Sequence, residues 1–595
     1  MKTQIKIKAR YILLIFFITA LLNACQEDWL DPKPLSIYTP ENVFVDKAGM
    51  ESILLALREG LRHEIYSGSR MLASELYSSD ISICGSEVAA MPHNFNIQVT
   101  PTADVNTIRM MAFWELGYNH IRNANVVISR IDKANFTSES LRNATLAEGY
   151  FFRAYWYYRL VHQFGDVPFI NIEHTVPKLD FYSHSRNTIL NKIQQDLEFA
   201  VQWLPEVVDP GKINRAAGNH LLTKVYLSNH EFNKAVIVSS AVIDDGKHKL
   251  MTNRFGTVAG NSRFNVIWDL HQKANKSIST NTEGILIVQD KYGFPGAQTT
   301  GVNTMRDLTP FWCHASYIRD PEGRSGMRSA NFDPQIMRFG RGVGYVRSSN
   351  YFLYDIWRHN GYDLRHCPDT NWMPKEKILY NNPTSKYFGQ PVQIQYTSPY
   401  DTMRSFFEWP HYKIFVPHED NVGTPTGGNS DWYIYRLSET YLLRAEAYYW
   451  KGDFDNAAND INKVRERALA QPIANDDVTI EYILDERARE LYYEEPRKTE
   501  LTRIAFMMAE KNINGYSMNN FHVKNYWFDR VNTLNYYNTG LTYGAQPYVI
   551  SAYHVLWPIP QDQIDANTGG KINQNKGYMG AESNIPSKTE IKDDE

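Results

Sequence analysis

The carboxylates that could perform catalysis are concentrated in one segment, DERARELYYEE, at residues 485–495. Glu486, Glu490 and Glu494 recur every four residues, so a helix would place all three on one face. A glycosidase instead needs two carboxyl groups that flank the bond to be cleaved. Arg487 and Arg489 are interleaved with these glutamates. The pattern therefore predicts a face that braces the scaffold or meets solvent, and it argues against a catalytic pair.

Other catalytic or metal-binding motifs are absent from the sequence. His230-Glu231 lacks the second histidine of an HExxH zinc motif, and no serine occupies a GxSxG elbow. The glycines of FGRGVGY (339–345) follow no recognisable strand and precede no helix, which argues against a phosphate-binding loop. The motifs therefore give little support for an enzyme; we predict no cofactor, and no ligand cluster in the sequence identifies a metal ion.

The first 25 residues suggest a covalent lipid attachment. A basic start precedes an apolar run at residues 11–22, which is shorter than the ~20 residues that span a bilayer. Cys25 directly follows the small residue Ala24, so residues 1–24 look like a bacterial lipoprotein signal and Cys25 like the lipidated mature N-terminus. A buried cysteine in a membrane helix is the competing interpretation. The acidic Glu27 and Asp28 resemble a signal for the outer leaflet, and residues 25–40 form a proline-rich tether.

Composition describes an ordinary globular body behind this signal. The 595 residues are 43% hydrophobic and carry a net charge of −4, which gives no support for nucleic-acid binding. The remaining cysteines, Cys84, Cys313 and Cys367, cannot all pair within one chain, although one disulfide is possible. Aromatic residues reach 13%, including 38 Tyr and 13 Trp, and such residues fill cores or build binding surfaces.

Helical periodicity dominates residues 41–250. In AEGYFFRAYWYYRLVHQFG (147–165), five apolar residues fall at helical spacing, and Gly165 followed by Asp166-Val167-Pro168 predicts the end of the helix. FWELGYNHI (113–121) predicts another helix, with Trp114 in the core.

A helix–turn–helix repeat is predicted within residues 431–515. In SETYLLRAEAYYWKGDFDNAANDINKVRERA (438–468), Ala445 and Ala457 allow two helices to approach closely, as in a tetratricopeptide unit. Residues 216–243 repeat the pattern more weakly. Because the two copies lie far apart, we predict a long insertion between them.

That insertion, residues 251–430, is rich in Gly, Pro, Asn and aromatics and lacks helical periodicity. GILIVQD (284–290) predicts a short strand, and 339–345 predicts a loop. Residues 516–595 form a closing C-terminal segment. The predicted fold class is mainly α: a tetratricopeptide-like scaffold with a large, loop-rich insertion that contains short strands.

Four segments in this order resemble the SusD/RagB family. They are WLDPKPLSIYTPENVF (29–44), AEGYFFRAYWYYRLVHQFGDVPFI (147–170), YRLSETYLLRAEAYYWKGDFDNAANDINKVRERA (435–468), and EYILDERARELYYEEPRK (481–498) with WPIPQDQIDAN (557–567). One departure is Pro496, where the family tends to continue with Arg and an aromatic; proline should end the helix there.

The resemblance implies a non-catalytic, lipid-anchored protein on the extracellular face of the outer membrane. Such a protein binds oligosaccharides, or peptides in some branches, and presents them to a SusC-like TonB-dependent transporter. The helices would contact the transporter and the insertion would carry the ligand site. Two further functions compete with this one: a transporter lid without ligand affinity, and a surface hydrolase.

By the same resemblance, aromatic platforms of the insertion would bind sugar rings, and the loop at 78–97 would supply a second wall. The competing interpretation is that each aromatic residue packs the irregular insertion. The predicted ligand-binding residues are Asp80, Asn94, Phe95, Asn96, Trp312, Tyr317, Tyr345, Trp357 and Trp372.

Overall fold

The computed structural model describes residues 40–66, 71–86, 91–104, 109–298, 302–394, 401–420 and 422–594. The predicted signal at 1–24, Cys25 and the tether up to residue 39 lie outside these residues. Helix α2 begins at Pro40. Within the described part of the chain, no helix is both long and apolar enough to cross a membrane. No disulfide joins Cys84, Cys313 or Cys367 in this same part.

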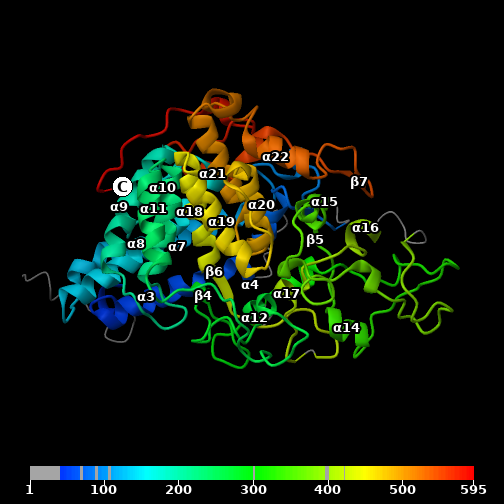
Figure 1. Cartoon of the computed structure of the whole chain (residues 1–595). Helices are drawn as coiled ribbons and strands as arrows, with labels where there is room; N and C mark the ends of the chain where they lie inside the picture. The colour runs from blue at the N-terminus through cyan, green and yellow to red at the C-terminus, as the bar shows by residue number, and fades with distance from the viewer. Residues whose placement is uncertain are drawn as a thin grey trace, which may run out of the picture.

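Three long helices form one end of a helical scaffold: α7 (Ala112–Arg130), α8 (Glu139–Phe164) and α9 (Arg186–Trp203). α8 packs between α7 and α9 (Figure 1). The five apolar residues at helical spacing within residues 147–165, from which this helix was predicted, are all at least 98% buried. Its first turn is capped by Ser138, whose hydroxyl accepts a hydrogen bond from the Leu141 backbone. Gly165 ends it with a φ of 73°, which confirms the predicted boundary.

The two predicted repeats pack together although they are far apart in the chain. α10 (Arg215–Ser228) pairs with α11 (Phe232–Ile243), and α18 (Leu437–Lys451) pairs with α19 (Phe454–Arg467). α11 lies directly against α18 (Figure 1). The structure thus confirms a mainly α, tetratricopeptide-like scaffold.

The insertion leaves this scaffold between α11 and α18 and returns to it through a two-stranded sheet. β4 (Gly284–Val288), which was predicted from sequence, pairs antiparallel with β6 (Trp432–Arg436), immediately before α18. The longest helices described within residues 251–430 contain six residues. Its short elements are α12 (Val266–His271), α13 (Thr304–Leu308), α14 (Pro334–Phe339), β5 (Val346–Ser348), α15 (Asn350–Leu353), α16 (Asp401–Arg404) and α17 (His411–Ile414).

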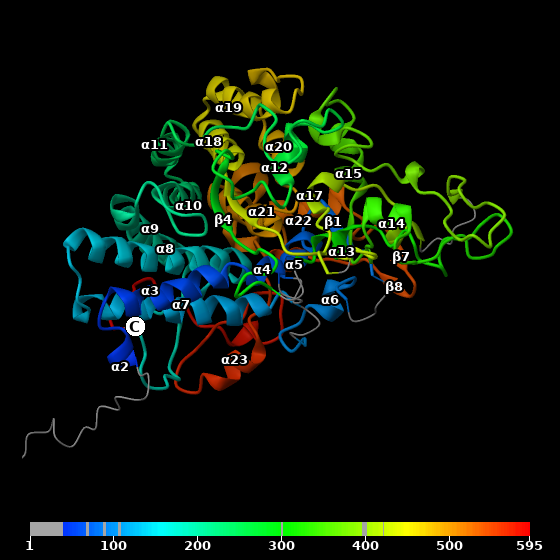
Figure 2. The ribbon, with the colours of Figure 1, turned by 90° about the horizontal axis from the view of Figure 1, so that it is seen from below.

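The remaining elements pack on the scaffold and the insertion (Figures 1 and 2). They are α2 (Pro40–Val43), α3 (Lys47–Gly60), α4 (His63–Tyr66), α5 (Met71–Tyr77), β1 (Ser82–Cys84), α6 (Phe95–Gln98), β2 (Val167–Pro168), β3 (Ser183–His184), α20 (Ile480–Leu491), α21 (Arg497–Glu510), α22 (Tyr526–Leu534), β7 (Thr542–Tyr543), β8 (Gln546–Pro547) and α23 (Gln561–Ala566). Among them, α20 packs on α18 and α21 on α8, in the middle of the molecule.

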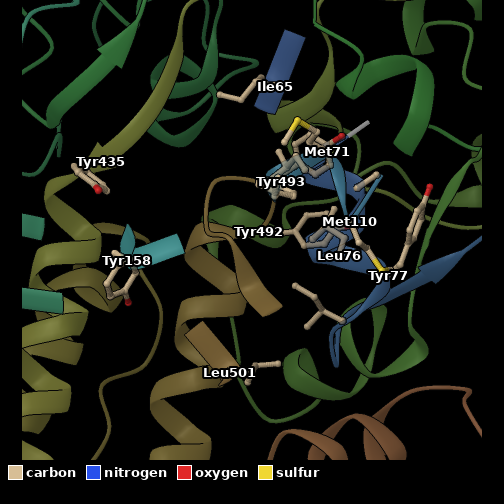
Figure 3. Packing of buried hydrophobic residues seen from close by; sticks show 14 of the residues in the cluster. Ile65, Met71, Leu76, Tyr77, Met110, Tyr158, Tyr435, Tyr492, Tyr493 and Leu501 are labelled. Atoms are coloured by element: carbon tan, nitrogen blue, oxygen red, sulfur yellow. The ribbon is translucent and has the colours of Figure 1, made fainter. Parts of the chain in front are cut away.

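One hydrophobic core runs through both parts of the molecule. Figure 3 shows a region of it, with Tyr158 of α8 and Tyr435 of β6 on one side and Tyr492 and Tyr493, which follow α20, in the middle. The same core includes Trp312 from the insertion. Continuous burial of apolar surface therefore joins the insertion to the scaffold.

Buried charges provide a second connection. The buried ion network, as we call it, has Glu490 of α20 at its centre, paired with Arg365 at 3.1 Å, Arg436 at 2.6 Å and Arg467. Its members are no more than 6% exposed at their side chains and come from both the insertion and the scaffold. They are Glu283, Arg365, Lys413, Arg436, Arg467, Glu490 and Glu494. The sequence predicted that the glutamate-bearing face of α20 would either brace the scaffold or meet solvent. The structure confirms that it braces the scaffold.

The helix break near Pro496 occurs slightly earlier than predicted. α20 ends at Leu491, and Tyr493 adopts a left-handed φ of 72°. Pro496 then directly precedes the first residue of α21, a position at which the fixed φ of proline is compatible with a helix start.

Candidate functional site

A short β-ladder joins the two segments that were predicted to form opposite walls of a ligand site. β1 pairs antiparallel with β5, with Cys84 opposite Val346. The pairing is extended by the Gly85 backbone N–H, which donates to the Tyr345 carbonyl at 2.8 Å. The loop at 78–97 and the aromatic insertion therefore meet beside Tyr345.

An aromatic–arginine cluster lies next to this ladder. The rings of His314 and Tyr317 stack with centroids 4.0 Å apart and an interplanar angle of 13°. Phe311 meets His314 edge-to-face at 4.4 Å. All four aromatic members are half-buried, so part of each is open to solvent. The cluster consists of Phe311, His314, Tyr317, Arg341, Tyr345 and Arg404.

The two arginines lie against the aromatic rings. The guanidinium carbons of Arg341 and Arg404 are 5.5 and 5.4 Å from the Phe311 ring centroid, and that of Arg404 is 5.7 Å from Tyr345. These distances fall within cation–π range. Arg341 donates through Nε to the Ser329 hydroxyl at 2.9 Å, and no described residue bonds its two terminal nitrogens. Those nitrogens can donate to hydroxyl or carboxylate oxygens of a ligand.

Close backbone approaches hold the cluster together. The Phe311 N–H donates to the Arg404 carbonyl at 2.9 Å, and the Gly344 N–H donates to the Thr309 carbonyl at 3.0 Å. Gly344 has a φ of 58°, and a Cβ there would lie 2.2 Å from the Arg404 carbonyl oxygen. A Cβ at Gly342 would lie 2.0 Å from the Thr309 carbonyl oxygen. The glycines of FGRGVGY therefore permit the close contacts that position the cluster.

Of the predicted ligand residues, Tyr317 and Tyr345 belong to this cluster. Trp312 does not: it is completely buried, and its indole N–H donates to the Gly340 carbonyl at 3.0 Å. Its ring packs edge-to-face on the ring of Phe339. This burial corrects the assignment of Trp312, because a ligand cannot reach its ring.

Trp357 and Trp372 form a separate packed group. They are 8% and 2% exposed, and their ring centroids are 5.6 Å apart. Trp357 stacks on His366 at 4.6 Å, while the Trp372 indole donates to Glu408 at 3.1 Å. The prediction that Trp357 and Trp372 bind ligand is therefore wrong, because their rings are not open to a ligand. Both residues pack the irregular insertion.

Asp80 is a buried ion-pair residue and not part of a ligand surface. Its carboxylate is completely buried and accepts hydrogen bonds from Arg497 at 2.9 and 2.7 Å and from Arg530 at 2.7 Å. Burial alone would raise the pKa of Asp80, but the two guanidinium charges outweigh it and hold the pKa well below its usual range. Arg497, the residue after Pro496, therefore anchors the loop before β1.

The residues of α6 contact the C-terminal segment. Phe95 is completely buried and meets Tyr537 edge-to-face at 5.5 Å, which removes it from the candidate surface. Asn94, half-buried, bridges to Val549, and exposed Asn96 accepts a hydrogen bond from Ser551 at 2.8 Å. The contacts described for these three residues thus do not reach the cluster, and of the three only Asn96 is exposed.

Sequence reasoning missed Phe311, His314, Arg341 and Arg404. A signal was present in FWCHASY, where Phe311, His314 and Tyr317 are three residues apart, a spacing that places side chains on one side of a tight turn. The larger Trp312 lies out of this phase and points into the core. The arginines had no local signal, because only backbone contacts distant in sequence bring them to Phe311.

The two acidic residues described near the cluster, Asp320 and Asp333, both serve structural roles. Asp320 accepts from the Ser385 hydroxyl at 2.6 Å and from turn backbone N–H groups, and Asp333 caps α14. Among the described residues, no group of three or more His, Cys, Asp or Glu side chains could hold a metal ion. Half-exposed rings with guanidinium groups at their side can bind flat, hydroxyl-rich ligands.

Comparison with known proteins identifies the family. The family model described as the SusD family matches residues 347–578, and a model described as "Starch-binding associating with outer membrane" matches residues 28–227. Together they cover most of the chain, which belongs to the SusD/RagB family.

Two relatives come from Formosa agariphila. SusD-like protein P25 is 23% identical over 94% of this chain and 97% of its own length. SusD-like protein P2 is 29% identical over 39% of this chain, and the match spans 46% of its length.

Solved structures share the fold. A laminarin-binding SusD-like protein superimposes with a TM-score of 0.61 at 21% identity, over 90% of this chain and all of its own. Surface glycan-binding protein A from Bacteroides thetaiotaomicron, in complex with laminarihexaose, gives 0.60 at 18% identity over 89% of this chain and 100% of its own.

Proposed function

We propose that this protein binds an oligosaccharide or polysaccharide at its aromatic–arginine cluster and does not cleave it. The observation that carries the proposal is the His314–Tyr317 stack, which together with Phe311 and Tyr345 offers half-exposed aromatic surface beside Arg341. The apolar C–H faces of a sugar ring pack on such rings, and Arg341 can donate to its hydroxyls. The glycan ligands of proteins with this fold support the same class of ligand.

The test is calorimetric titration of the chain from residue 26 onward with a panel of neutral and anionic oligosaccharides, beginning with laminarihexaose. Tyr317→Ala should weaken binding of the best ligand about fivefold, since it removes a stacking surface worth about 1 kcal/mol. Tyr362→Ala is the matched control, because Tyr362 is 61% exposed elsewhere in the insertion. Equal affinity of the two variants, or no binding across the panel, contradicts the proposal; the latter result favours peptide capture or a lid without ligand.

The N-terminal segment and the family support a proposal for the location and the partner. Cys25 carries lipid and tethers the protein to the extracellular face of the outer membrane, where it delivers its ligand to a SusC-like TonB-dependent transporter. Metabolic labelling with radioactive palmitate tests the anchor: the wild-type chain should incorporate label and Cys25→Ala should not. Co-purification of the SusC-like transporter with the lipidated protein tests the partner. A label that persists in Cys25→Ala contradicts the proposed attachment site.

A further inference from the structure

A second hollow lies between α7, the segment at 168–181 and α23. Its volume is about 300 Å³, at the lower end of the range for small-molecule sites. Tyr118 and Phe181 supply partly exposed aromatic surface above the buried Trp114, while Glu115, Asn119 and Gln563 supply polar groups. We call this the α7–α23 pocket. Figure 2 shows α23 beside α7, away from α13 and α14, which flank the aromatic–arginine cluster.

Fixed aromatic rings line the pocket. Trp114 and Tyr118 are one helical turn apart on α7, with ring centroids separated by 4.8 Å. The Tyr118 hydroxyl donates to the Pro168 carbonyl at 2.7 Å, which sets the direction of its ring. Trp114 is 4% exposed, so it forms the floor, whereas Tyr118 and Phe181 are half-buried and present more surface.

Phe181 is held in place by the segment after α23. Its backbone N–H donates to the Asn567 side-chain oxygen at 2.8 Å, and the Asn567 amide donates back to the Phe181 carbonyl at 2.9 Å. The Gly569 N–H donates to the Leu179 carbonyl at 2.6 Å. These bonds preform the wall, so a ligand would not have to order it on binding.

The polar groups at the entrance are available to a ligand. Glu115 and Asn119 are exposed, four residues apart on one face of α7, and no described residue hydrogen-bonds to either side chain. Gln563 is exposed on α23 and also lines the pocket; its amide donates to the neighbouring, exposed Asp562 at 3.2 Å, and its side-chain oxygen can accept from a ligand. A carboxylate acceptor and two amides that can both donate and accept therefore surround an aromatic floor.

We propose that the α7–α23 pocket is a second saccharide site that holds one or two sugar rings. A sugar places its C–H face on Tyr118 and Phe181 while its hydroxyls bond Glu115, Asn119 and Gln563. The inference rests on the proposed function in one respect only, that glycans are the ligands this protein meets. When one polymer occupies both sites of the protein, binding at one site raises the effective concentration of the polymer at the other. A long glycan should therefore bind more tightly than a short one.

The test reads the pocket directly. The chain from residue 26 onward is labelled with 5-fluorotryptophan, and the Trp114 resonance is assigned by its absence from Trp114→Phe. Millimolar glucose, galactose, mannose, xylose, glucuronic acid and their β-linked disaccharides are then titrated by fluorine NMR. At least one sugar should shift the Trp114 signal in the wild-type protein. Phe181→Leu keeps apolar volume but removes the flat ring, and should abolish that shift. The double variant Glu115→Gln with Asn119→Ala should lower the sugar affinity measured from that shift severalfold.

A variant of the other site separates the two hypotheses. Tyr317→Ala should leave the Trp114 shift unchanged, whether or not calorimetry finds a ligand for the aromatic–arginine cluster. If no sugar moves the Trp114 signal, or if the shift persists in Phe181→Leu, the second site is refuted, even when the cluster binds. If the shift disappears in Tyr317→Ala, the signal reports the cluster and the second site is likewise refuted.

Discussion

Many contacts of the helical scaffold join helices that are neighbours in the chain, although α11 also packs on the distant α18, whereas the insertion depends on contacts between distant residues. In the scaffold, neighbouring helices such as α8 and α9, or α18 and α19, pack directly on one another. In the insertion, ordering depends on distant pairs, such as the Phe311 N–H with the Arg404 carbonyl, and on the buried ion network. Substitutions can therefore be chosen to damage the fold or the candidate binding surface separately.

The largest effect is expected at the junction of the two regions. Glu490→Gln removes the carboxylate shared by Arg365, Arg436 and Arg467, all of which remain buried. Losing one partner of a buried pair costs about 3–5 kcal/mol, so the free energy of unfolding in urea should fall by that amount. Glu466→Gln is the control, because its pair with Lys463 is exposed and should contribute less than about 1 kcal/mol. Similar losses in both variants would contradict the bracing role.

Asp80→Asn should destabilise the fold by about 3 kcal/mol at neutral pH, since Arg497 and Arg530 lose a buried counter-charge. The pKa of Asp80 is lower in the fold than in the unfolded chain. Its charge therefore stabilises the fold fully above the unfolded pKa of about 4, and this contribution is lost as the pH falls further. The difference between variant and wild type in urea unfolding should accordingly shrink below about pH 4. A difference that does not depend on pH would exclude the charge as its origin.

Gly344→Ala should damage binding more than the scaffold. The new Cβ would meet the Arg404 carbonyl at 2.2 Å and must displace the backbone that positions the cluster. We expect at least a tenfold loss of glycan affinity by calorimetry, about 1.4 kcal/mol. Gly389→Ala shares the positive φ, at 77°, but has no atom within 4 Å of its Cβ. Equal affinities of these two variants would show that the close approach does not organise the site.

The smallest effect is expected at Arg341. Arg341→Met keeps the apolar stem but removes the guanidinium beside Phe311, so glycan affinity should fall severalfold, about 0.5–1 kcal/mol. Arg358→Met serves as control because Arg358 is exposed and pairs only with Asp355 among the described residues. An affinity for Arg341→Met that matches the control would restrict recognition to the aromatic rings.

The same contrast explains what could be predicted from sequence. α8 and the α18–α19 pair follow from apolar spacing and from Gly165 and Gly452, because helices are specified by neighbours in the chain. Within the insertion, the strand at Gly284–Val288 was correct, and two cluster tyrosines were found. Trp312 was misassigned because residue type alone does not say which side of a turn faces solvent. Arg404 is 93 residues from Phe311, and no local pattern places it there.

The central claim is that sugar rings bind on Tyr317, Tyr345 and the adjoining members of the cluster. A crystal structure of the chain from residue 26 onward, soaked with the tightest oligosaccharide of the panel, tests it most directly. The account predicts density for a sugar ring within about 4 Å of the Tyr317 ring, with a hydroxyl or carboxylate within hydrogen-bond distance of an Arg341 terminal nitrogen. Density for the same ligand elsewhere on the molecule, with the cluster empty, would contradict it.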